Sequence, residues 1–64
     1  MQANDQALEL LRGKLRAEMN DRADHIAGGS CEDIEEYRFQ VGIVHGLAWA
    51  ERELLDLDER LTAE

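Results

Sequence analysis

The side chains best suited to chemistry in this 64-residue chain lie around one Gly-Gly pair. His25 precedes the pair, and Cys31, Glu32 and Asp33 follow it, with His45 further along. Imidazole, thiolate and carboxylate groups are the ligands of zinc. Zinc ligands usually come as spaced pairs, however, and the chain contains no C-x-x-C and no H-x-x-x-H. We therefore expect capping and surface residues here, with no metal or cofactor site.

Cys31 is the candidate nucleophile of the chain. At the first position of a helix its thiol should have a lowered pKa, and His25 is near enough in sequence to act as its base. A pair of helices, however, offers no pocket to hold a substrate. The sequence therefore predicts no catalytic residue and a protein that is not an enzyme.

Two clusters of acidic residues, called the first and second acidic group, are the remaining candidates for a functional site. The first contains Glu32, Asp33, Glu35 and Glu36. It falls in the first turns of a predicted helix, where negative charge is favourable. The second contains Glu51, Glu53, Asp56, Asp58 and Glu59. It lies toward a helix C-terminus, where the dipole disfavours it, so these five residues either face solvent or form a docking face for a basic partner.

A single long helix over residues 31–62 must position most of these side chains. Ser30 is a favourable N-cap, and Asp33 completes an S-x-x-D variant of the capping box. A helix over about 4–27 precedes it and should stop at the glycine pair, because glycine accepts a left-handed backbone without strain. Residues 28–30 then form a short turn. The sequence predicts one all-α domain over residues 1–64, an antiparallel helical hairpin with a longer second helix.

The apolar residues of the long helix form two heptad-like stripes about 120° apart. The first contains Ile34, Tyr37, Val41, Val44, Ala48 and Leu55. The second contains Ile43, Leu47, Ala50, Leu54, Leu57 and Leu61. One neighbouring helix covers one stripe, so the second stripe predicts a second chain in a dimeric helical bundle. The alternative is one broad face with some leucines exposed.

The register predicted for the hairpin leaves part of the second stripe uncovered. The first helix presents Leu8, Leu11, Leu15, Met19 and Ile26 on one face. With a turn near Gly29, the second helix should extend past the first beyond about Leu54. Leu57 and Leu61 would then have no partner within the hairpin.

Gly42 and Gly46 lie inside the long helix, where each costs about 1 kcal/mol relative to alanine. That cost indicates close packing, either of another backbone or of the Trp49 ring over the glycines. Trp49 and Phe39 lie off the centres of both stripes and are either such a cover or interface anchors. Tyr37 lies on the first stripe and is expected in the core.

The length and composition indicate a thin core. A chain of this size buries only about 60% of its unfolded surface, and the single cysteine cannot form an internal disulfide. Oligomerisation is therefore the expected source of added stability. The sequence contains no run of about 18 apolar residues, which a membrane-spanning helix would need. Residues 1–5 do not resemble a secretory signal. We expect a cytoplasmic protein or one assembled from the cytoplasm into a larger particle.

The net charge is −8, from 15 acidic and 7 basic residues, and it is unevenly distributed. Residues 1–30 hold five acids and four bases, whereas residues 31–64 hold ten acids and three bases. Direct binding to nucleic acid is disfavoured because it needs a basic face. A basic protein partner, or mimicry of nucleic acid, fits the charge.

The segments Glu36-Tyr37-Arg38, Val41-Gly42 and Gly46-Leu47, with the acidic, leucine-bearing stretch that follows, resemble short helical proteins of tailed bacteriophages. The genes of those proteins often lie among head and connector genes. The resemblance covers residues 34–58. It implies a non-enzymatic phage protein, in the host cytoplasm or in the virion, and carries over no catalytic residue.

The function predicted from the sequence is therefore that of an interaction or structural protein that self-associates or packs into a larger assembly. The predicted interface comprises Ile43, Leu47, Trp49, Ala50, Leu54, Leu57 and Leu61, with close packing at Gly42 and Gly46. The alternative is a small acidic inhibitor that binds a basic host protein, in counter-defence or as a nucleic-acid mimic, through the second acidic group.

Overall fold

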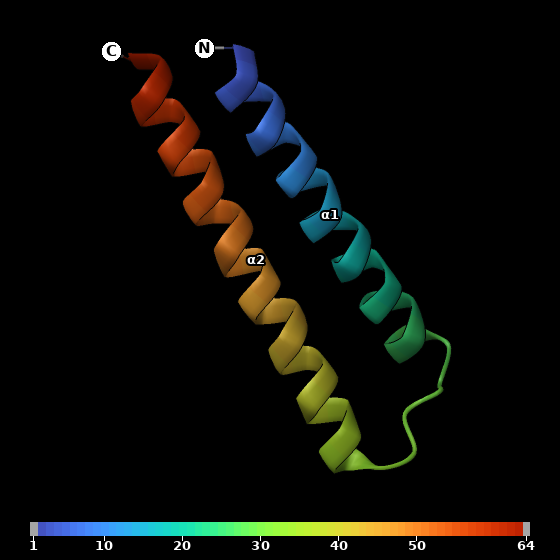
Figure 1. Ribbon diagram of the computed structural model, residues 1–64. Coiled ribbons are helices and arrows are strands. Elements are labelled where there is room, and N and C mark those ends of the chain that lie inside the picture. Colours follow the sequence, from blue (N-terminus) through green and yellow to red (C-terminus); the bar gives the residue numbers. More distant parts are fainter. Residues whose placement is uncertain (1, 64) are drawn as a thin grey trace.

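The computed structural model describes residues 2–63, and side chains from residue 6 onward, as two helices packed side by side (Figure 1). Helix α1 spans Gln2–Ala27 and helix α2 spans Ile34–Ala63. They run antiparallel in a slender molecule that measures 47 × 15 × 11 Å. The predicted all-α hairpin with a longer second helix is confirmed.

The end of α1 follows the expected glycine chemistry. Gly29 has a φ of 76°, the left-handed conformation that glycine adopts without strain. Its N–H donates to the Ile26 carbonyl at 3.1 Å, and the Ser30 N–H donates to the His25 carbonyl at 3.2 Å. These two hydrogen bonds form a Schellman motif, which satisfies carbonyls that the helix end would leave unpaired.

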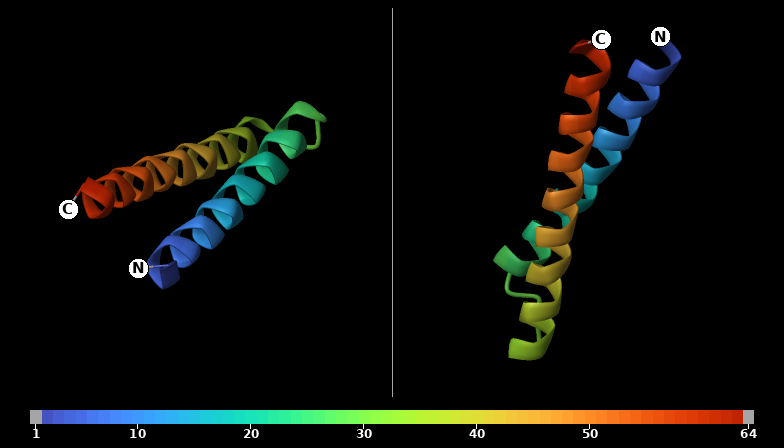
Figure 2. Two further views of the ribbon diagram at one scale, coloured as in Figure 1. Left: turned by 90° about the horizontal axis from the view of Figure 1, so that it is seen from above. Right: turned by 90° about the vertical axis from the view of Figure 1, so that its left-hand side faces the viewer.

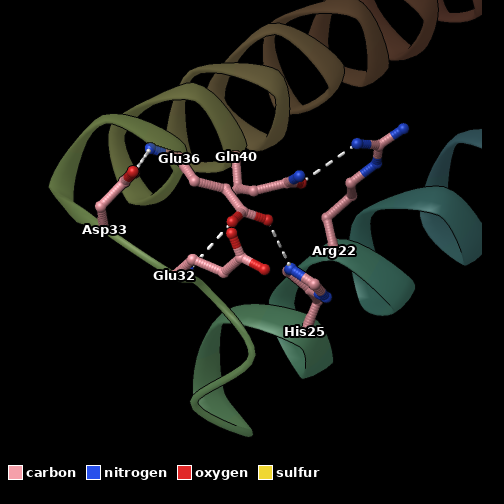
Figure 3. Close-up of polar contacts among 6 residues, drawn as sticks. All are labelled: Arg22, His25, Glu32, Asp33, Glu36 and Gln40. Carbon is pink, nitrogen blue, oxygen red and sulfur yellow. Dashed lines mark hydrogen bonds and ion pairs between the residues drawn. The ribbon is translucent and has the colours of Figure 1, made fainter.

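The start of α2 differs from the prediction, because the N-cap is Asp33 and not Ser30. The Glu36 N–H donates to Asp33 Oδ1 at 2.8 Å, and the Glu36 carboxylate accepts from the Glu32 N–H at 3.0 Å (Figure 3). This reciprocal arrangement resembles a capping box displaced by three residues. Ser30 is unavailable because its backbone completes the α1 terminus, and the chain still has to cross the 8–10 Å or so between two packed helix axes.

The longer connection changes the register of the hairpin. The predicted overhang of α2 is wrong: the first turn of α1 and the last turn of α2 lie at the same end of the molecule (Figure 1). Leu8 of α1 and Leu54 of α2 line the same shallow hollow, together with Thr62 near the end of α2. The connection uses residues 28–33 in place of 28–30, so α2 begins later and α1 covers more of its C-terminal half.

The core is thin. Among residues 6–63 the buried apolar side chains are Met19 and Leu54, and no large side chain in that range is fully buried. The two helices cross at an angle and separate toward their free ends (Figure 2). Exposed large apolar side chains are Leu10, Leu11, Ile34, Tyr37, Phe39, Trp49, Leu55, Leu57 and Leu61. Tyr37, which the stripe pattern placed in the core, is therefore a surface residue.

Candidate interaction surface

The face of α2 that contacts α1 lies between the two apolar stripes. Gln40 and Glu51 hydrogen-bond to α1, and Leu54 is buried against it. At about 100° per residue these side chains point within roughly 40° of the direction of Leu47. Helix α1 therefore covers the inner edge of each stripe and leaves both outer edges exposed.

Glu51 is the polar centre of the contact between the helices. It is only 7% exposed, and Arg16 Nη2 lies 2.7 Å and 2.8 Å from its two carboxylate oxygens. Arg12 Nε lies 3.5 Å from one of them. The hydrogen bond from Arg16 lowers the pKa of Glu51, against a smaller opposing effect of desolvation, with further help from the charges of Arg16 and Arg12. Glu51 therefore holds the two helices of the hairpin together. Its predicted place in a solvent-exposed or docking acidic face is wrong, because its carboxylate is buried against α1.

A second set of polar contacts ties the turn end of the hairpin together. Arg22 Nε lies 3.0 Å from the Glu18 carboxylate, and its Nη1 donates to Gln40 Oε1 across the helices at 3.0 Å. His25 Nε2 lies 3.1 Å from Glu36 Oε2 (Figure 3). The pKa of Glu36 is lowered, first by the hydrogen bond from the Glu32 N–H and then by that of His25.

Cys31 lies beside this pair. One ligand atom each of His25, Cys31 and Glu36 falls within 4.8 Å of the others, and all three residues are half-buried. The pKa of the Cys31 thiol is raised by partial desolvation and then by the charges of Glu36 and Asp33. The predicted lowering is wrong, because α2 begins at Ile34 and Cys31 is not in its first turn.

The outer edges of the stripes form two flanks on either side of the contact with α1, and one flank also includes Phe39, Gly42 and Gly46, which lie next to the second stripe. We call one the glycine flank, which consists of Phe39, Gly42, Ile43, Gly46, Ala50, Leu57 and Leu61. We call the other the tyrosine flank, which consists of Tyr37, Val41, Val44, Ala48 and Leu55. Their centres point roughly 80–90° to opposite sides of the Leu47 direction.

The glycine flank is open within the hairpin. A Cβ atom at Gly42 or at Gly46 would meet nothing within 4 Å. The Trp49 side chain is 62% exposed and does not cover the glycines, so that explanation of their presence is wrong. Close approach of another chain to the two glycines stays a prediction.

The predicted interface residues divide between the interior and the surface. Leu54 is buried inside the hairpin and is not available to a second chain, and Leu47 is half-buried. Ile43 and Ala50 are half-buried, and the exposed members are Trp49, Leu57 and Leu61. Of the second acidic group, Glu53, Asp56 and Glu59 are exposed, whereas Asp58 is half-buried beside the hollow at Leu8.

Comparison of the chain with protein-family models, with curated proteins and with solved structures gives no match. Neither helix, over residues 2–63, is long and apolar enough to cross a membrane.

Proposed function

We propose that this protein is a self-associating interaction protein whose glycine flank packs against the same flank of a second copy. The observation that carries the proposal is the mismatch between core and surface. Among residues 6–63, two apolar side chains are buried, whereas nine large ones are exposed, five of them on the two stripes of α2. Burial of such surface in a second chain is favourable by about 25 cal/mol per Å².

The glycines favour this flank over the tyrosine flank. Each glycine inside α2 costs about 1 kcal/mol relative to alanine, yet nothing in the hairpin occupies the space that a side chain would fill. A second helix that approaches closely would offset that cost. Phe39 and Leu57, which are 63% and 47% exposed, lie on the same flank and supply large apolar contacts to the partner.

A second copy is the partner that the stability of the chain favours. An isolated hairpin of this size is marginal, and a symmetric dimer would build a four-helix core from flanks that are already present. From the resemblance to short helical proteins of tailed bacteriophages, we propose further that the dimer belongs to a larger phage assembly. The protein would then be located in the host cytoplasm or in the virion.

Sedimentation equilibrium of the parent and of Gly46→Leu tests the proposal. Leucine at position 46 meets open space in the hairpin and favours the helix, so the monomer should stay folded by circular dichroism. The parent should sediment as a dimer at micromolar concentration and Gly46→Leu as a monomer. Gly13→Leu is the matched control, because position 13 is also open and lies on α1, and it should dimerise like the parent. A folded monomeric parent, or a Gly46→Leu variant that dimerises as well as the parent, would refute the interface.

The acidic outer side of α2 supports a second candidate, an inhibitor of a basic host protein. Glu53, Asp56 and Glu59 are exposed and point away from the contact with α1. Such a surface would bind a basic nuclease or DNA-binding protein in a salt-sensitive way. Pull-down from host lysate at low and high salt tests this candidate. Failure to recover a basic protein at low salt excludes it.

A further inference from the structure

We propose that the closed end of the hairpin binds one zinc ion through His25, Cys31 and Glu36. These residues come from three different segments, namely the last turn of α1, the connection and the first turn of α2. Their nitrogen, sulfur and oxygen ligand atoms nevertheless gather within 4.8 Å of one another. A mixed set of imidazole, thiolate and carboxylate ligands suits zinc better than magnesium or calcium, which prefer oxygen ligands alone.

One of the three distances already fits a tetrahedral site. Zinc bound at about 2.0–2.3 Å would separate its ligand atoms by roughly 3.2–3.7 Å. His25 Nε2 and Glu36 Oε2 are already 3.1 Å apart. The ligand atoms of the cluster lie within 4.8 Å of one another, so the two distances to Cys31 would have to shorten by no more than roughly 1.1–1.6 Å, through a change in the rotamer of that short side chain.

Neighbouring groups hold the carboxylate ready for a metal. One oxygen of Glu36 accepts from the Glu32 N–H at 3.0 Å, which leaves the oxygen beside His25 to bind the ion. Outer hydrogen bonds of this kind orient metal ligands. When the ion binds, the Cys31 S–H bond breaks, a Zn–S bond forms and the proton passes to the buffer. The thiolate and the Glu36 carboxylate then balance the charge of the ion, and water completes the fourth position.

A zinc ion here would fasten α1, the connection and α2 to one another at the end opposite the chain termini. The sequence alone predicted no metal site, because these ligands do not form spaced pairs. The Schellman motif and the Asp33 cap are what fold His25, Cys31 and Glu36 toward one point. This inference is independent of self-association, because all three ligands belong to one chain.

Zinc titration of the reduced full-length chain, in competition with a chromophoric chelator, tests the site. The parent should bind one zinc per chain. Cys31→Ser, His25→Gln and Glu36→Gln should each weaken binding by at least about tenfold. His45→Gln and Glu35→Gln are matched controls outside the cluster and should bind like the parent. Circular dichroism of the zinc-free variants shows whether each one folds.

Cobalt substitution gives a second measurement that reports the thiolate directly. The Co²⁺-loaded parent should show a thiolate-to-metal charge-transfer band that Cys31→Ser lacks. Gly46→Leu should bind zinc like the parent whether or not it dimerises. The site is refuted if Cys31→Ser retains parental zinc affinity, if the parent binds half a zinc per chain, or if no cobalt–thiolate band forms.

Discussion

Leu54 and Leu57 distinguish the core of the hairpin from its proposed interface. Both are leucines of the second stripe of α2, but they are 8% and 47% exposed. Leu→Ala removes the equivalent of three CH₂ groups, or about 2.4 kcal/mol when the side chain is fully buried. Scaled by the buried fraction, the cost in the isolated hairpin is about 2 kcal/mol for Leu54→Ala and about 1 kcal/mol for Leu57→Ala. The slender hairpin can relax around a lost side chain, which keeps the value for Leu54→Ala at the low end of the usual range of about 2–5 kcal/mol.

Self-association changes the comparison, because the dimer would bury the exposed part of Leu57 as well. Each chain of the dimer then loses about 1 kcal/mol more in Leu57→Ala, and the two chains together lose about 2 kcal/mol. The dimer dissociation constant should therefore rise by about 30-fold. The dissociation constant for Leu54→Ala, by contrast, should change only through the loss of folded monomer.

The assay combines sedimentation equilibrium with urea unfolding followed by circular dichroism at two protein concentrations. In dilute samples Leu54→Ala should be the less stable variant, and in concentrated samples the stability of Leu57→Ala should fall further below that of the parent. If Leu57→Ala sediments like a dimeric parent, the glycine flank is not the interface. If Leu57→Ala is the less stable variant in dilute samples, the register of the hairpin argued above is wrong.

Three further predictions test the hairpin by chemical denaturation. Asp33→Ala should lose about 1 kcal/mol through the N-cap of α2, whereas Ser30→Ala should stay within about 0.5 kcal/mol of the parent because its side chain caps nothing. Gly29→Ala should cost about 1–2 kcal/mol, since φ is 76° there, whereas Gly13→Ala should add up to about 1 kcal/mol in an open helical position. The lowered pKa of Glu51 stabilises the fold above the ordinary value of 4.5, and that contribution is lost as the pH falls through the folded pKa. Urea unfolding across the acid range should therefore show a flatter pH dependence for Glu51→Gln than for the parent, and an unchanged dependence would contradict the ion pair with Arg16.

The sequence by itself determined the features that depend on local backbone chemistry. A helix turns by about 100° per residue, so spacing alone groups Leu8, Leu15 and Met19 on one face. The glycine pair stops α1 because the left-handed conformation at Gly29 is cheap for glycine alone. These effects act within a few residues of the chain. For that reason, two helices joined near residue 29 could be predicted without knowledge of any tertiary contact.

The tertiary structure decided where the connection ends and which face of α2 meets α1. Ser30 and Asp33 are both good N-caps, and the choice between them depends on the distance that the connection must span. The apolar pattern indicated a stripe as the contact, whereas α1 packs over the line between the stripes. There Glu51 meets Arg16, a pairing that joins residues 35 positions apart. This ion pair fixes how α2 is rotated about its own axis relative to α1. The rotation depends on where the side chains of α1 lie, and the residue pattern of α2 alone does not contain that information.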